Sequence, residues 1–145
     1  MDLAALIFWL LTAAGGAYML GISMRAGAGT STARESHLPP LVVFSHAGLA
    51  LFGLAVWGVY MSIEDRGVAW LAFAVLVVVA LLGSVLLHRW LRTRRGPRSG
   101  AELDEHVAEQ QIPVPAVVGH GVAAALTIVL VLLTALGVGG TTGLQ

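Results

Sequence analysis

The sequence predicts an all-α integral membrane protein, folded as a four-helix up-down-up-down bundle that is built from two related helical hairpins. Its composition, four long apolar stretches and a repeated proline–histidine pattern predict this class. Apolar residues make up 57% of the 145 residues and charged residues 11%, with a mean hydropathy of +0.86. Such values are typical of membrane proteins. We expect a single domain, residues 1–145, embedded in the lipid bilayer of the cell's inner (plasma) membrane.

The composition also excludes several classes of function. The chain has no cysteine, which excludes disulfides, thiolate metal ligands and cysteine catalysis. The net charge is zero, so there is no basic footprint that would indicate nucleic acid binding. The sequence shows no nucleophile–base pair, phosphate loop or carboxylate dyad. It therefore gives no basis for a hydrolase or transferase, and whether the protein is an enzyme stays open.

Four stretches are long enough to cross a membrane as helices, at about 3–24, 39–63, 68–90 and 113–138. A hydrocarbon core of roughly 30 Å takes about 20 helical residues, and helices satisfy every backbone group without water. The prolines at 39, 40, 113 and 115 suit the first turn of a helix, where a missing N–H costs little. A tight turn at 64–67 joins the second and third spans, and longer connections cover 25–38 and 91–112.

The arginines predict the orientation of these spans. Seven of the eight basic residues lie in or beside the two long connections: Arg25, Arg34, Arg89, Arg92, Arg94, Arg95 and Arg98. By the positive-inside rule these connections are cytoplasmic, so both termini of this multi-pass chain lie outside. Threading the chain through the membrane then places all five histidines on the cytoplasmic side.

The start of the second span recurs at the start of the fourth. Six residues separate Pro39 from His46, and six separate Pro113 from His120, with small residues on both sides of each histidine. The pattern predicts two imidazoles inside the membrane at about the same depth. Titratable side chains are costly there and indicate function, so His46 and His120 are the first candidates for site residues.

Three interpretations of this pair stay open. Histidines on facing helices of a bundle commonly hold haem, which predicts haem b between His46 and His120, with Arg25 and Arg89 near its propionates. Alternatively, His46, His88 and His120 form a three-nitrogen site for a transition-metal ion. In the third interpretation there is no cofactor, and the histidines only fix the bundle of an accessory or assembly subunit.

The proline, apolar pair, histidine and glycine that open the second and fourth spans resemble those of small four-helix membrane proteins of high-GC bacteria, which implies the fold but no activity. In plan, though not in sequence, the chain is similar to membrane b-type cytochromes. That resemblance covers only His46 and His120 and implies electron transfer, with quinone or other membrane redox subunits as partners. Cytochromes of the b561 kind carry histidine pairs at both membrane faces, whereas this chain offers one face only.

Overall fold

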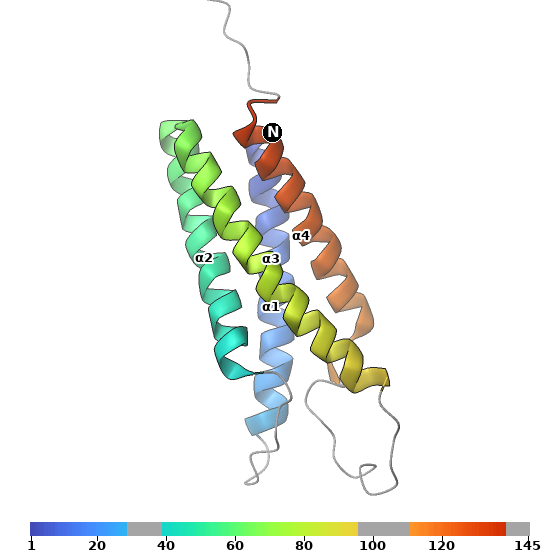
Figure 1. Cartoon of the computed structure of the whole chain (residues 1–145). Helices are drawn as coiled ribbons and strands as arrows, with labels where there is room; N and C mark the ends of the chain where they lie inside the picture. Colours follow the sequence, from blue (N-terminus) through green and yellow to red (C-terminus); the bar gives the residue numbers. More distant parts are fainter. Residues whose placement is uncertain (29–38, 96–110, 139–145) are drawn as a thin grey trace, which may run out of the picture.

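The computed structural model describes residues 1–28, 39–95 and 111–138, and these form four helices (Figure 1). They are α1 (Asp2–Ala28), α2 (Pro40–Ile63), α3 (Arg66–Arg95) and α4 (Val114–Ala135). Each helix is long and apolar enough to cross a membrane. The prediction of an all-α chain with four apolar spans is confirmed in this form. Most of the long connections, 29–38 and 96–110, lie outside the described residues.

The helix boundaries follow local chemistry. Pro39 and Pro113 are the N-caps of α2 and α4 in extended conformation, and each is followed by a proline in the first helical turn. Between α2 and α3 only Glu64 and Asp65 are non-helical. Glu64 adopts a left-handed φ of 53°, and Asp65 caps α3 by accepting a hydrogen bond from the Val68 N–H at 3.0 Å. The connection is therefore shorter than the expected turn at 64–67.

Three helix ends differ from the expected spans by more than two residues. Helix α1 continues past Met24 to Ala28, into the expected connection at 25–38. Helix α3 continues past Trp90 to Arg95, because the leucine and arginines of 91–95 are good helix formers and the single threonine among them does not break the helix. Helix α4 ends at Ala135 rather than near 138. There Gly137 takes a φ of +79°, and the Val138 N–H donates to the Leu133 carbonyl at 2.8 Å, which is the glycine-terminated pattern of a helix end.

The four helices pack as neighbours around a square. Helix α2 packs against α3 and α1, and α4 packs against α1 and α3. Within the described residues, no backbone contact joins α2 with α4 or α1 with α3, so these pairs lie on the diagonals. We call the end that holds Glu64 and Asp65 the turn end. The opposite end, which holds Arg25 and the last turn of α3, is the arginine end (Figure 1).

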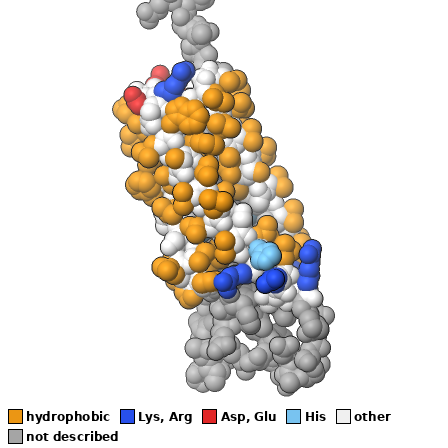
Figure 2. Space-filling model, viewed as in Figure 1, with side chains coloured by type: hydrophobic (Ala, Val, Ile, Leu, Met, Phe, Trp, Pro, Cys, Tyr) orange, Lys and Arg blue, Asp and Glu red, His pale blue; other side chains and the backbone are white. Residues whose placement is uncertain are grey.

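A buried cluster fills the half of the bundle nearer the turn end. Its largest members are Trp9 and Trp57, which are 2% and 0% exposed with ring centroids 6.3 Å apart. Gly53 admits the Trp9 indole, because a Cβ at that position would lie 2.9 Å from Trp9 Cζ2. Most other large apolar side chains face outward, as the largely apolar surface in Figure 2 shows. An apolar exterior fits helices whose outer faces contact lipid rather than water.

Candidate functional site

His46 lies in the half of α2 nearer the arginine end and reaches across to α3. Its Nδ1 is 3.0 Å from the backbone carbonyl oxygen of Val79. A carbonyl can only accept, so Nδ1–H is the donor and the neutral ring keeps its lone pair on Nε2. The ring lies over Gly83, where an added Cβ would be 3.0 Å from His46 Cε1. Glycine at this position therefore allows the imidazole to reach the α3 backbone.

His120 repeats this arrangement between α4 and α1. Its Nδ1 donates to the backbone carbonyl of Thr12 over 2.9 Å. Its Cε1 would lie 3.3 Å from a Cβ at Gly16, and its own Cβ would lie 3.5 Å from one at Gly15. The bond has the same direction as at His46, so in the neutral form of each ring the lone pair lies on Nε2.

The two bonds share one local design. In each case the acceptor carbonyl comes four residues before the glycine beneath the ring: Val79 before Gly83, and Thr12 before Gly16. Within an α-helix the carbonyl of residue i already accepts the N–H of residue i+4. The imidazole therefore shares a helical carbonyl with the glycine N–H and is held by backbone rather than by a side chain.

The two rings meet across a diagonal of the bundle. Their centroids are 6.3 Å apart and their planes are inclined at 60°. Both rings are partly buried, and within the described residues Nε2 of neither one makes a hydrogen bond. The structure thus brings together the two histidines that the sequence repeat singled out. In each ring Nδ1 is hydrogen-bonded to a backbone carbonyl, and Nε2 makes no hydrogen bond among the described residues.

The other predicted site residues lie elsewhere. His88 is exposed on α3, where it lines an open cleft with Arg89 and Arg92, and Arg25 is exposed near the end of α1. Among the described residues, no group of three or more histidine, aspartate or glutamate side chains is placed to hold a metal ion. Two of the three predicted metal ligands are therefore close together, and His88 does not join them.

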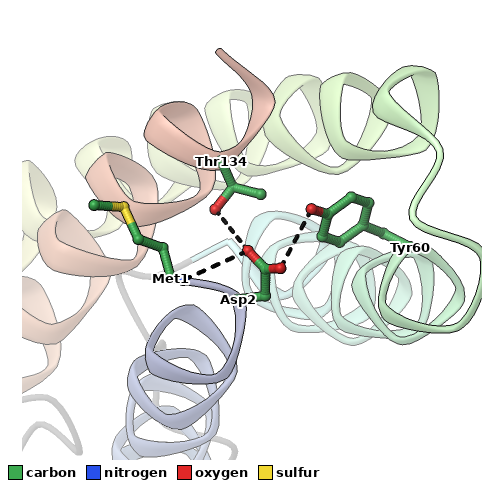
Figure 3. A network of polar contacts seen from close by, with 4 residues as sticks. All are labelled: Met1, Asp2, Tyr60 and Thr134. Atoms are coloured by element: carbon green, nitrogen blue, oxygen red, sulfur yellow. Dashed lines mark hydrogen bonds and ion pairs between the residues drawn. The ribbon is translucent and has the colours of Figure 1, made fainter. Parts of the chain in front are cut away.

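A second polar cluster at the turn end was not predicted from the sequence (Figure 3). The Asp2 carboxylate accepts a hydrogen bond from the Thr134 hydroxyl at 3.1 Å and one from the Tyr60 hydroxyl at 3.4 Å, and the N-terminal amine of Met1 lies 3.9 Å from it. These bonds tie the start of α1 to the ends of α2 and α4. One sequence signal could have indicated this cluster. Tyr60 follows His46 by the same number of residues as Thr134 follows His120, so both hydroxyls are expected at the same level of the bundle.

Comparison of the chain with protein-family models, with curated proteins and with solved structures gave no match. We therefore infer the function from the geometry of the histidine pair.

Proposed function

We propose that this chain is a b-haem-binding integral membrane protein that acts in electron transfer or as a subunit of a redox complex, with His46 and His120 as the axial ligands. The observation that carries the proposal is the 6.3 Å separation of the two ring centroids. Imidazoles that bind one metal ion from opposite sides, with metal–nitrogen distances of about 2 Å, have centroids roughly 6 Å apart. The distance between the two rings is therefore compatible with His46 and His120 together holding one haem.

The bonds at Nδ1 support the same assignment. Metal-binding histidines usually donate their other ring N–H to a carbonyl or carboxylate, which fixes the tautomer and makes the ligating nitrogen more basic. His46 and His120 donate to the carbonyls of Val79 and Thr12. The Nδ1 bond orients each ring, and Nε2 is the nitrogen that would bind the metal of the haem.

The ligand count favours haem over a bare metal ion. Zinc and similar ions take three or four protein ligands, and the described residues bring only two imidazoles together. A haem supplies four nitrogens of its own and requires two axial ligands from the protein. The small residues beside the rings, Gly15, Gly16 and Gly83, keep side-chain bulk low around the pair.

Haem would supply one-electron chemistry. The chain would bind the haem, orient it and separate it from the surrounding lipid and water. A haem held by one histidine pair near one end of the bundle would exchange electrons at only one face of the membrane. We therefore infer a one-sided relay whose partners are quinone or other membrane redox subunits, rather than a complete path across the bilayer.

The same proposal includes the topology and the orientation. We infer an up-down-up-down bundle of two related hairpins, α1–α2 and α3–α4. If α3 corresponds to α1 and α4 to α2, the contact of His46 with Gly83 corresponds to the contact of His120 with Gly16. Core positions agree with this exchange, since Ala5 and Ala72 are both fully buried. With the arginine end cytoplasmic, both termini lie outside the plasma membrane and the histidines lie in its cytoplasmic half.

The decisive test is an absorption spectrum of the purified, detergent-solubilised protein, oxidised and then reduced with dithionite, with pyridine haemochrome and total-metal analysis. We expect a Soret band and sharp reduced α and β bands. Both should be lost in His46→Ala and in His120→Ala. His88→Ala is the matched control, because it removes an imidazole outside the pair and should leave the spectrum unchanged. A folded protein that stays spectrally silent after reconstitution with haem would refute the proposal.

One observation favours a second candidate, a cofactor-free accessory subunit. The Nδ1 bonds of His46 and His120 already join α2 to α3 and α4 to α1, which is a structural role in itself. This candidate predicts a colourless protein in which both alanine variants lower thermal stability. Metal found without porphyrin would instead favour the histidine metal site.

A further inference from the structure

The buried side chains of the bundle lie almost entirely on one side of the histidine pair. On the turn-end side all four helices contribute buried residues, among them Trp9, Trp57, Leu76 and Val131. On the arginine-end side the described side chains are those of residues 17–25, 39–45, 84–95 and 111–119. Only Trp90 and Ile112 among them are buried. The arginine-end half of the bundle therefore has little side-chain core of its own.

The helices also diverge toward this end. At the turn end only Glu64 and Asp65 separate α2 from α3, and Figure 1 shows the arginine ends of the same two helices standing clearly apart. Parts of a protein with few buried apolar contacts open locally at a lower free energy than the packed core. The arginine-end half is therefore expected to be the less stable half of the bundle.

At the level of the histidines, hydrogen bonds join the helices in twos. The bond from His46 Nδ1 to the Val79 carbonyl joins α2 with α3, and the bond from His120 Nδ1 to the Thr12 carbonyl joins α4 with α1. The two rings face each other with centroids 6.3 Å apart, and within the described residues no hydrogen bond links them. A ligand bound by both rings would therefore connect all four helices in series.

We propose that occupancy of the histidine pair controls the packing of the arginine-end half, which is loose while the pair is empty and is fixed when one ligand binds Nε2 of both His46 and His120. The ligand ties α2 to α4, and the two Nδ1 bonds extend that tie to α3 and α1. A ligand that binds only the closed arrangement stabilises it by mass action. Haem as the ligand rests on the proposed function, whereas the looseness of the empty form does not. The exposed Arg25 and Arg92 stand on these helix ends, so the loaded and empty forms present different charged surfaces.

The test measures distances between two spin labels by pulsed electron paramagnetic resonance, which is practical because the chain has no cysteine of its own. Phe44→Cys with Val118→Cys labels α2 and α4 on the arginine-end side, where both side chains are 57% exposed. Val59→Cys with Val129→Cys is the matched pair on the turn-end side, at 51% and 52% exposure. In the haem-free, detergent-solubilised full chain we expect a broad distance distribution for the first pair and a narrow one for the second. Saturating haem should narrow the first distribution and leave the second unchanged.

The Soret band of the same samples separates this inference from the proposed function. Haem that binds without narrowing the first distribution would overturn the inference and leave the proposed function intact. A first distribution as narrow as the second in the haem-free protein would overturn it whatever the spectrum shows. If no Soret band appears and added haem changes neither distribution, both fail. The response should be lost in His46→Ala and in His120→Ala and retained in His88→Ala, and a response that survives in either of the first two variants would also overturn the inference.

Discussion

Gly83 offers the sharpest test of the histidine geometry, because the space above it is occupied by the His46 ring. An alanine Cβ at this position would lie 3.0 Å from His46 Cε1, whereas ordinary van der Waals contact begins at 3.4 Å. The ring cannot simply move away, since its Nδ1 is bonded to the Val79 carbonyl one turn earlier. Gly83→Ala must therefore displace the imidazole by a few tenths of an ångström, and so lengthen or bend that bond.

The magnitude follows from two opposed contributions. Alanine in place of glycine stabilises an exposed helix interior by about 1 kcal/mol, while overpacking at a tight site costs about 1–3 kcal/mol. At Gly48 and Gly119 an added Cβ meets nothing within 4 Å. Gly48→Ala and Gly119→Ala should therefore gain the helix-propensity contribution without any cost of overpacking. We expect Gly83→Ala to be less stable than either control by about 1–3 kcal/mol.

The assay is reversible denaturant unfolding of the detergent-solubilised protein, with the free energy of unfolding compared among the three glycine variants. Gly16→Ala should fall between them, because its Cβ would be 3.3 Å from His120 Cε1. If Gly83→Ala is as stable as Gly48→Ala, the ring does not lie over Gly83 and the proposed anchoring of His46 is wrong.

Two further predictions concern the turn end and the core. Thr134→Val should lower the free energy of unfolding by about 0.5–1.5 kcal/mol, as expected for an interhelical hydrogen bond in a membrane, and Tyr60→Phe by less because its bond to Asp2 is longer. Both costs should largely vanish in an Asp2→Ala background; costs that persist there would show that Asp2 is not the shared acceptor. Gly53→Ala should cost about 1–3 kcal/mol, since its Cβ would meet Trp9 Cζ2 at 2.9 Å and Val75 Cγ1 at 3.1 Å. Combination with Trp9→Phe should recover part of that loss, and simple additivity of the two variants in the same unfolding assay would count against the contact.

Much of the fold could be predicted from the sequence, because the length and hydropathy of an apolar stretch are enough to identify a membrane-spanning helix. The four helices, the short connection after Ile63 and the shared level of His46 and His120 all follow from such local signals. The extension of α3 to Arg95 was missed because hydropathy marks where an apolar run ends, not where helical hydrogen bonding ends. Helix propensity carries that second signal.

The contacts between helices could not be predicted in the same way. In a water-soluble bundle the apolar stripe shows which face points inward. Here the outward faces are apolar too, so the pattern does not show how each helix is rotated about its axis. For this reason the burial of Trp9 against Trp57, the bonds from Tyr60 and Thr134 to Asp2, and the carbonyl partners of the histidines all emerge only from the structure.

The use of backbone carbonyls as acceptors has a consequence for how this chain can change over evolution. No point mutation at Thr12 or Val79 can delete the oxygen that holds His120 or His46, so these two bonds place no constraint on which side chain stands at either position. The constraint falls instead on the imidazoles and on the glycines one turn away, where any side chain intrudes. Distant relatives that keep these bonds should therefore preserve two histidines and two glycines in this spacing, while only packing and local hydrogen bonds select the side chains of the accepting residues.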